Sequence, residues 1–459
     1  MSAVGTAAAR EIAFETLNRF KIKRHDASQI LHEIIERTDE KQRATDLVFG
    51  TIRNLRAIDG VIESVGQVPI HRISKGVLNL IRMGAYELFY VPATAEYAIV
   101  SETVELAKVR LGKKHANFVN AILRRIQRDI VNRKAVLSDA NRARVLPQTS
   151  EQGCEFNGEI LPRFETNPAE YLSCAFSIPL WLIKQWADEF GMEQTKQICF
   201  ASNRRASIYI RVNRLRTTVE RVVELFEAKG LRCRVVPGTC MVQIRSGSAV
   251  SELPGYSEGF FTVQDLSAGR AAELLSAKSG GLIADLCAAP GGKTTQLVEI
   301  MKDEGRVIAT DIDAKRLEKV VENCRRLRIG ISQCVEYEKF GALVKEAGLF
   351  DAVLVDVPCS NTGVLARRSE VRLRITDEMI GHLAEIQQGL LNKAAEIPLK
   401  MGGKICYSTC SIQHQENRCI VDSFLSGRKD FELEAEKITL PSCGEFDCDG
   451  GYCAILLRK

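Results

Sequence analysis

From residue 266 to the end of the chain, short apolar runs alternate with small-residue or polar turns and with amphipathic stretches. LIADLC is followed by AAPGGKTTQLVEIM, and VIATDID is followed by AKRLEKVVENCRRL. Short apolar runs of this kind predict buried strands, and helical stretches between them predict parallel pairing of those strands. Residues 266–459 are therefore expected to form a doubly wound, mainly parallel sheet in an α/β domain.

Acidic and cysteine side chains stand at or just after the ends of these predicted strands. They are Cys287, Asp311, Asp356, Cys359 and Cys410. Ligands of doubly wound sheets bind beyond the carboxyl ends of the strands. One crevice is therefore expected to collect all five side chains.

The turn in DLCAAPGGKTTQL (285–297) is built from small residues and two glycines. Small side chains let a ligand approach the backbone amides at the start of the following helix. The pattern is neither GxGxxG nor GxxxxGK[ST], so neither a dinucleotide fingerprint nor a Walker loop is present. Asp311 ends the next strand, where an acid accepts hydrogen bonds from ribose hydroxyls. These features predict a nucleoside-type cofactor without a pyrophosphate, and S-adenosylmethionine fits that description.

The chain contains 15 cysteines but no CxxC pair, and its six histidines do not cluster with them. We therefore expect no metal site. Most of the thiols are expected to be reduced, small and buried. For Cys359 alone, a structural thiol under a loop is the ordinary interpretation. Cys410 at the end of another strand changes this, since two such thiols in a reducing compartment indicate shared chemistry at one substrate rather than a disulfide.

Apolar residues recur at three- and four-residue spacing throughout residues 4–130, which predicts a compact, all-helical bundle. Asp26, Ser74 and Ser101 stand where helix N-caps are expected. Residues 106–129 are strongly basic, through Lys108, Arg110, Lys113, Lys114, Arg124, Arg125 and Arg128. Such a segment is more often a solvated helix face than a phosphate-binding surface, and both interpretations stay open.

Two further regions lie between the bundle and the catalytic sheet. Residues 131–168 lose the helical periodicity and are polar, so we expect a linker. Residues 169–265 mix helical stretches such as SIPLWLIKQWADEF with strand-like ones such as RASIYIRVNRL. They are expected to form a small α+β subdomain.

Composition restricts the class of protein. Hydrophobic residues make up 45% of the chain and charged residues 26%, as in soluble globular proteins. The first residues do not form a secretory signal, and no apolar run reaches the roughly 20 residues that span a bilayer. We expect a soluble, cytoplasmic protein, monomeric and without a membrane partner.

Several stretches resemble one protein family. DLCAAPGGKTTQL, DVPCSNTGV and YSTCSIQHQEN are similar to the three diagnostic motifs of the NOL/Sun RNA 5-methylcytosine methyltransferases. The first part of the chain resembles the NusB-like helical domain of the bacterial RsmB/Sun branch, through AREIAFETL, GTIRNL, RMGAYELFY and FVNAILRRIQRD. The middle of the chain resembles the middle segment of the same branch, through SIPLWLIKQW, IRVNRLR and FFTVQDLSA. The resemblance covers nearly the whole chain outside 131–168.

The resemblance implies a multidomain methyltransferase. A NusB-like RNA-binding bundle (1–130), the linker and an α+β RNA-recognition subdomain (169–265) would precede a Rossmann-like catalytic domain (266–459). Its implied activity is methylation of cytosine C5 in 16S ribosomal RNA by S-adenosylmethionine. The RNA partner is expected either free or within a partly assembled small subunit.

The resemblance also assigns roles to single residues. Cys410 forms a covalent bond to C6 of the cytosine, Cys359 assists release of the product, and Asp356 holds the base and touches the cofactor. The remaining cofactor contacts that it implies are Cys287, Ala288, Ala289, Pro290, Gly291, Gly292, Lys293, Asp311 and Glu338. Lys293 is also expected to lower the pKa of a catalytic thiol by its charge.

The chain departs from the family pattern at three places. Where an aspartate is usual near the adenine, CVEYEKF offers Glu336 or Glu338. ARRSEVRLR (366–374) lacks the usual His-Pro, and DGGYCAILLRK replaces a DGFF ending. Two alternatives were weighed: a tRNA cytosine-C5 methyltransferase, and a non-catalytic RNA-binding or antitermination-type factor. The second is disfavoured because both cysteines and the AAPGGK turn are intact.

Overall fold

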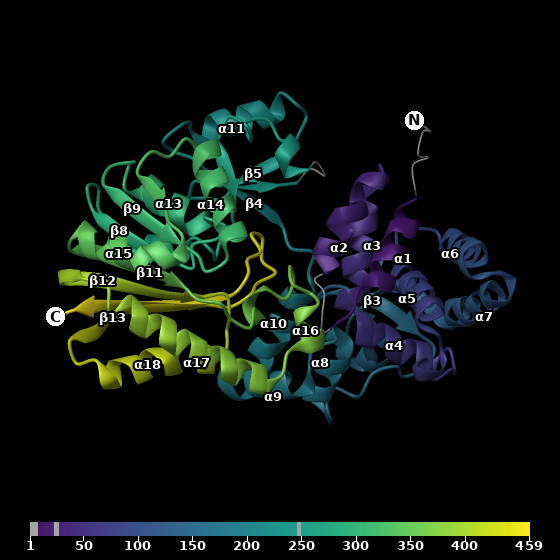
Figure 1. Cartoon of the computed structure of the whole chain (residues 1–459). Coiled ribbons are helices and arrows are strands. Elements are labelled where there is room, and N and C mark those ends of the chain that lie inside the picture. Colours follow the sequence, from purple (N-terminus) through teal and green to yellow (C-terminus); the bar gives the residue numbers. More distant parts are fainter. Residues whose placement is uncertain (1–7, 23–26, 246–248) are drawn as a thin grey trace. The chain divides into compact units, whose positions relative to one another are not determined.

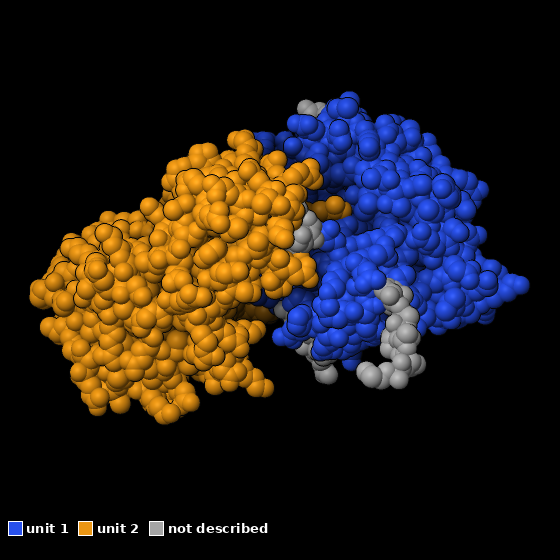
Figure 2. Space-filling model, turned by 90° about the horizontal axis from the view of Figure 1, so that it is seen from above, with its two compact units in different colours: residues 1–204, 365–374 blue, residues 205–364, 375–459 orange. Residues whose placement is uncertain are grey.

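The computed structural model describes residues 8–22, 27–245 and 249–459. The chain folds into two compact units (Figure 2). Unit 1 comprises the residues up to 204 together with 365–374, and unit 2 comprises 205–364 and 375–459. The candidate catalytic residues all belong to unit 2.

Unit 1 begins with a bundle of α-helices (Figure 1), as the sequence predicted. Its long helix α5 is buried along most of its length and is the centre of the bundle. Ser74 precedes α5 as predicted, whereas Ser101 is not an N-cap because its helix already begins at Glu96; Asp26 lies outside the described residues. The helices are α1 (Ala9–Arg19), α2 (Ala27–Ile34), α3 (Lys41–Arg53), α4 (Leu55–Ser64), α5 (Lys75–Tyr90), α6 (Glu96–Leu111) and α7 (Lys113–Asp129), with short 3-10 turns η1 (Ile35–Arg37) and η2 (Ile70–Arg72).

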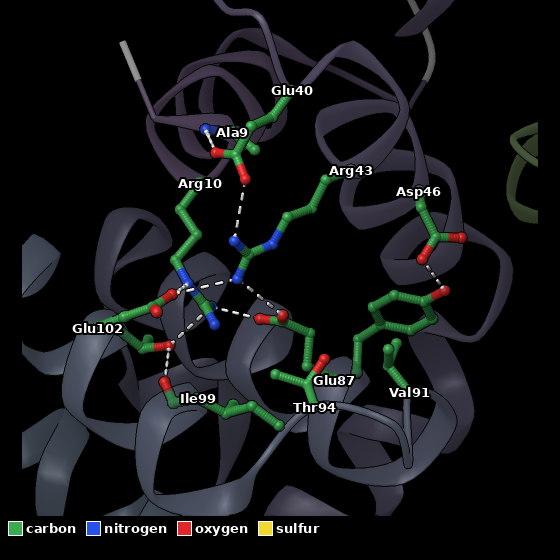
Figure 3. A network of polar contacts seen from close by, with 12 residues as sticks. Ala9, Arg10, Glu40, Arg43, Asp46, Glu87, Val91, Thr94, Ile99 and Glu102 are labelled. Carbon is green, nitrogen blue, oxygen red and sulfur yellow. Dashed lines mark hydrogen bonds and ion pairs between the residues drawn. The ribbon is translucent and has the colours of Figure 1, made fainter. Parts of the chain in front are cut away.

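A network of charged side chains ties four of these helices together (Figure 3). Arg10 of α1 pairs with Glu87 of α5, and its Nε lies 2.8 Å from a carboxylate oxygen of Glu102 in α6. Arg43 of α3 donates to Glu102 at 3.1 Å and to Glu40 at 3.2 Å. Burial raises the pKa of Glu87 although both guanidinium groups oppose the rise. Removing one partner would therefore leave a buried charge uncompensated.

Residues 131–168 are not the structureless linker that we expected. They contain most of a three-stranded antiparallel sheet in the order β1-β3-β2. Its strands are β1 (Ile130–Val136), β2 (Val145–Pro147) and β3 (Gln152–Phe156), and the 3-10 turn η3 (Asp139–Arg144) joins the first two. The strands are short and carry many polar residues, so their apolar alternation was too weak to predict them.

Arg133 of β1 fixes this sheet to the bundle. Its guanidinium donates to the carbonyl oxygens of Leu88 at 2.7 Å, Glu87 at 2.7 Å, Val91 at 2.7 Å and Thr94 at 2.6 Å. The first three lie at the carboxyl end of α5, where helix carbonyls lack partners within the helix. One half-buried cation therefore caps the central helix.

Three helices complete unit 1, so the predicted subdomain 169–265 is divided between the two units. They are α8 (Pro168–Phe176), α9 (Leu180–Phe190) and α10 (Met192–Asn203). The short helix α16 (Val371–Arg374) also belongs to this unit. Arg372 is fully buried, and its guanidinium donates to the carbonyl oxygens of Phe176 at 2.8 Å and Ser202 at 2.7 Å.

The first part of unit 2 is a small four-stranded antiparallel sheet in the order β5-β6-β4-β7. Its core packs the inward residues of the strands against Val222 and Phe226 of α11. This agrees with the small α+β domain that the sequence predicted. The elements are β4 (Ile208–Val212), α11 (Val219–Glu227), β5 (Cys233–Val235), β6 (Met241–Ile244), the 3-10 turn η4 (Val250–Glu252) and β7 (Phe261–Val263).

A seven-stranded sheet in the order β10-β9-β8-β11-β12-β14-β13 forms the rest of unit 2. The first five strands in this order, β10, β9, β8, β11 and β12, are parallel to one another. Strand β14 pairs antiparallel with β12, and β13 pairs antiparallel with β14. The strand order reverses between β8 and β11, which creates a switch point of the kind where ligands bind. The strands are β8 (Leu282–Leu286), β9 (Arg306–Thr310), β10 (Ser332–Cys334), β11 (Phe350–Asp356), β12 (Leu399–Thr409), β13 (Phe431–Thr439) and β14 (Gly451–Arg458).

Helices cover both faces of this sheet, with α13 and α14 on one side and α17 and α18 on the other (Figure 1). Alternation along β11 explains why both faces need cover, since Val353 and Val355 join one core while Ala352 and Leu354 join the other. Within the described residues, no helix combines the length and apolarity needed to cross a membrane. The elements are α12 (Arg270–Leu275), α13 (Gly292–Ile300), α14 (Ala314–Leu327), α15 (Tyr337–Ala347), η5 (Thr362–Val364), α17 (Asp377–Ala394), η6 (His414–Glu416) and α18 (Arg418–Gly427).

Arg133→Met should destabilise unit 1 by about 2 kcal/mol, because several α5 carbonyls lose a charged donor. Hydrogen exchange at the amides of α5 measures this free energy locally. Arg163→Met is the matched control, since Arg163 is exposed and its guanidinium pairs with the carboxylate of Glu159. Equal exchange rates in the two variants would show that Arg133 does not hold the helix.

Candidate active site

The structure brings the five predicted strand-end residues to one edge of the sheet. Strands β9, β8, β11 and β12 are successive parallel neighbours. Asp311, Cys287 and Cys410 directly follow β9, β8 and β12, whereas Asp356 is the last residue of β11 and Cys359 lies just beyond it. The parallel topology alone therefore gathers these five residues at one edge, as the sequence predicted.

The two candidate catalytic thiols touch. The Sγ atoms of Cys359 and Cys410 lie 2.9 Å apart, and both thiols are free. Cys359 is buried, whereas Cys410 is half-buried. The Oδ1 atom of Asn361 lies 3.2 Å from the sulfur of Cys410. The hydrogen bond to Cys410, together with burial, raises the pKa of Cys359 far above its usual value.

Lys293 and Asp356 form an ion pair beside these thiols. The Nζ atom of Lys293 lies 2.7 Å from Oδ2 of Asp356, whose side chain is one-third exposed. Burial lowers the pKa of Lys293, but the charge and hydrogen bond of Asp356 outweigh it, so the net pKa is raised. The charge of Cys410 raises it further, so this lysine is electrostatically coupled to that thiol.

Asp311 shapes the turn that the sequence assigned to the cofactor. Its Oδ2 atom accepts a hydrogen bond from the Ala289 amide at 3.1 Å, and its Oδ1 atom accepts one from the Asp313 amide at 3.1 Å. Arg316 of α14 donates to the carbonyl oxygen of Ala289 at 2.9 Å. These contacts join the turns that follow β8 and β9. The acid and the loop therefore hold each other in place.

The backbone of this turn is held in an unusual conformation. Cys287 has φ of 60° and Gly291 has φ of 98°. Positive φ is rare for a residue with a Cβ and is ordinary for glycine. A Cβ added at Gly292 would meet nothing within 4 Å, so space is open beside the first turn of α13. A ligand can therefore approach these amides closely.

Arg211 of β4, which the sequence did not single out, braces the same helix. Its guanidinium donates to both carboxylate oxygens of Glu299, at 2.8 and 3.0 Å, to the carbonyl of Gly292 at 3.1 Å and to Thr295 at 3.0 Å. Arg211 is almost fully buried. A bidentate pair of this kind fixes geometry as well as charge. The small sheet thus holds the start of α13, which carries Lys293.

Ile312 is a second residue that sequence analysis missed. It follows Asp311 directly, and its side chain is 82% exposed. A large apolar side chain exposed at a ligand-binding edge is available to contact a flat apolar ring. Its position next to the strand-ending acid was the signal that would have identified it. Loop, acid and apolar side chain together fit the nucleoside part of S-adenosylmethionine.

Asp285 lies at the base of this site, near the end of β8. It is buried, and its Oδ2 atom accepts a hydrogen bond from Thr294 at 2.6 Å. Burial raises the pKa of Asp285 to about 7, against the effect of that hydrogen bond. The group therefore carries a proton for much of the time near neutral pH.

The two candidate acids after β10 are less informative. Glu336 precedes α15 and pairs with Lys339 at 2.6 Å, and Glu338 is exposed in the first turn of that helix. The choice between them as a cofactor contact therefore stays a prediction. Among the described residues, no group of three or more histidine, cysteine or acidic side chains is placed to bind a metal ion.

Comparison with protein families assigns all three predicted parts of the chain. Residues 272–448 match the family model for 16S rRNA methyltransferase RsmB/F. Residues 7–128 match the NusB family, and residues 178–250 match the ferredoxin-like domain of RsmF/B-like methyltransferases. The predicted multidomain architecture and the resemblance noted from the motifs are therefore confirmed.

Curated relatives match over almost the whole chain. The probable ribosomal RNA small subunit methyltransferase B of Synechocystis is 31% identical, over 91% of this chain and 88% of the relative. The ribosomal RNA small subunit methyltransferase B of Cronobacter sakazakii is 30% identical over 98% of both chains. The probable enzyme of that name in Bacillus subtilis is 29% identical over 93% of this chain and 91% of the relative.

Solved structures share the fold. The crystal structure of PH0851 has a TM-score of 0.73 at 22% identity and covers 99% of each chain. A methyltransferase homologue from Pyrococcus horikoshii has a TM-score of 0.53 at 24% identity, over 63% of this chain and 98% of that one.

The site and the relatives agree on the kind of chemistry. The predicted cofactor, S-adenosylmethionine, is confirmed by the methyltransferase family model and by relatives of matching length. The residues that we assign to it remain a proposal. The chain belongs to the ribosomal RNA small subunit methyltransferase B family.

Proposed function

We propose that the protein methylates C5 of a cytosine in 16S ribosomal RNA through a covalent bond between Cys410 and C6 of the base. The observation that carries this proposal is the pair of thiols, 2.9 Å apart, at the strand edge that also holds the cofactor loop. A methyltransferase acting on a nitrogen or oxygen atom does not need two thiols beside its methyl donor. Carbon methylation does need a nucleophile.

The first step is addition of Cys410 to the base. C5 of cytosine is too weak a nucleophile to attack a methyl group directly. When the Cys410 thiolate bonds to C6, the electron pair of the C5–C6 double bond shifts towards C5 and the ring becomes enamine-like. The cation of Lys293 is electrostatically coupled to this thiol.

Asp356 holds the base during this addition. Its Oδ2 atom is bound to Lys293, which leaves Oδ1 available for the edge of the cytosine. When the thiolate adds, N3 takes up a proton from water, and the Asp356 carboxylate accepts a hydrogen bond from the resulting N3–H, which orients the ring and balances its charge. The cytosine must be unstacked from the RNA to reach this position.

S-adenosylmethionine supplies an electrophilic methyl group that C5 takes up. We assign residues 287–293 to the cofactor, with Asp311 on the ribose hydroxyls and Ile312 against the adenine ring. The geometry that supports this is the exposed Ile312 side chain next to Asp311, whose carboxylate is already fixed by the loop. Glu338 is a weaker candidate because it is exposed in α15.

Release of the product is assigned to Cys359. After methylation the C5 proton passes to water, the C–H electron pair forms the C5–C6 double bond again, and the Cys410 sulfur leaves as a thiolate. The thiol of Cys359 lies close enough to donate a hydrogen bond to that departing sulfur. The raised pKa of Cys359 suits this role, because the donor must keep its own proton.

The basic segment 106–129 is proposed to contact the RNA backbone. It spans the end of α6 and all of α7. Its basic side chains are largely exposed, including Lys113 and Lys114 at the start of α7. Clustered exposed cations release counterions from nucleic acid, which favours this interpretation over a simply solvated face. A tRNA substrate is disfavoured, since the relatives described above are named for ribosomal RNA.

Replacing each cysteine should give opposite results. Cys410→Ala should abolish methylation and form no covalent complex with the RNA. Cys359→Ala should accumulate a covalent protein–RNA adduct, because addition proceeds and elimination stalls. Denaturing gel electrophoresis with labelled 16S rRNA measures the shifted band.

Cys419→Ala serves as the control for this pair, since Cys419 is exposed on α18 rather than at the strand edge. An adduct formed by the Cys410 variant instead would mean that the two roles are reversed. Absence of an adduct from every variant would contradict covalent catalysis.

Ile312→Ala should weaken cofactor binding about tenfold, through loss of apolar contact worth about 1.5 kcal/mol. The fold should be unaffected because the side chain is exposed. Titration calorimetry with S-adenosylmethionine measures the dissociation constant without RNA. Met401→Ala, at a comparably exposed position in β12, is the control. Equal affinities of the two variants would place the adenine elsewhere.

A further inference from the structure

Glu416 is a buried acid that the mechanism above does not use. It is the last residue of η6, in the turn between β12 and α18, and none of its surface is exposed. Burying a carboxylate is costly unless several donors replace its water. A fully buried acid next to reacting groups therefore needs an explanation.

Its carboxylate binds the two residues that follow the catalytic cysteines. Oε1 accepts a hydrogen bond from the Ser360 amide at 2.8 Å, and Oε2 accepts hydrogen bonds from the hydroxyls of Ser360 and Ser411. Ser360 directly follows Cys359, and Ser411 directly follows Cys410. One carboxylate therefore holds both cysteine-bearing turns.

Neighbouring elements hold Glu416 itself in place. Gln387 of α17 donates to Oε1 at 3.0 Å and to the carbonyl of Pro358 at 2.9 Å. The hydroxyl of Tyr407 donates to the Glu416 carbonyl at 2.6 Å. All of these donors are neutral, and no ion pair involves Glu416 in the described part of the chain. Its negative charge is therefore satisfied by hydrogen bonds but not cancelled.

The hydrogen bonds of this carboxylate are unequal on the two turns, because it binds both the amide and the hydroxyl of Ser360 but only the hydroxyl of Ser411. The pKa of Cys359 is raised by its hydrogen bond to Cys410, by burial and by the charge of Glu416. On the other side, the cation of Lys293 is coupled to Cys410 and paired with Asp356. Tyr407 also faces Cys359, and its own pKa is raised by burial and by that thiol, so it stays neutral. The anion of Glu416 therefore acts on Cys359, whereas the cation of Lys293 is coupled to Cys410.

We propose that Glu416 is a positioning residue that fixes both turns and keeps Cys359 in its thiol form, so that Cys410 is the nucleophile. This inference rests on the proposed function, which assigns the nucleophile role to Cys410 and product release to Cys359. Without the anion, the two sulfurs would still differ in burial and in the coupling of Lys293 to Cys410. The carboxylate adds to this difference and holds the two turns that carry it.

Thiol labelling tests the proposal without RNA or cofactor. The wild type and Glu416→Gln are treated with iodoacetamide to less than one label per molecule across a range of pH, and each site is quantified by mass spectrometry. The midpoint of each pH profile reports the ionisation of the thiol and not the access of the reagent to it. In the wild type, Cys410 should titrate at lower pH than Cys359.

In Glu416→Gln, the midpoint for Cys359 should fall by about one pH unit, which is about tenfold faster labelling at a fixed pH below it. Glu416→Asp keeps the charge and should restore the wild-type order of the two midpoints. Glu434→Gln is the control, since it removes a partly exposed carboxylate that pairs with Lys404 on β12.

Two results would overturn the proposal. One is a Glu416→Gln protein with a lower melting temperature but an unchanged Cys359 midpoint, as a merely structural role predicts. The other, measured on the wild type and independent of whether the variant folds, is a Cys359 midpoint at or below that of Cys410. Because the assay contains no RNA, its outcome is distinct from a failure of the proposed methylation.

Discussion

The site depends on one constraint, which is that four parallel strands end on the same edge of one sheet. Strands β9, β8, β11 and β12 are adjacent, so residues far apart in the chain meet there. Cys359 and Cys410 touch because β11 and β12 are paired from Ala352 to Asp356. A change in the register of that pair would separate the thiols. The chemistry is therefore a consequence of strand order before it is a consequence of any one side chain.

Electrostatics then separates groups that the sheet brings together. Lys293, which is paired with Asp356, is electrostatically coupled to Cys410, whereas the charge of Glu416 raises the pKa of Cys359. Two identical thiols in contact need such asymmetry to perform different steps. The low dielectric constant around buried groups strengthens each electrostatic interaction. The fold thus brings the groups together, and the charges around them assign their roles.

Much of the site could be predicted because its residues follow apolar strands directly. Asp311 and Cys410 are local signals of this kind. Arg211 and Glu416 could not be predicted, because their importance lies in partners distant in the chain, Glu299 and Ser360 for example. The sheet in residues 131–168 was missed for another reason, since its short polar strands are stabilised by tertiary contacts rather than by local pattern.

Transfer of the methyl group to C5 of cytosine is the central claim, and loss of the C5 hydrogen tests it most directly. 16S rRNA carrying tritium at C5 of its cytosines is incubated with the protein and S-adenosylmethionine, and both tritium released to water and methyl groups incorporated are counted. Our account predicts one tritium released for each methyl group added. Methyl incorporation without tritium release would contradict it, since the methyl group would then be on another atom.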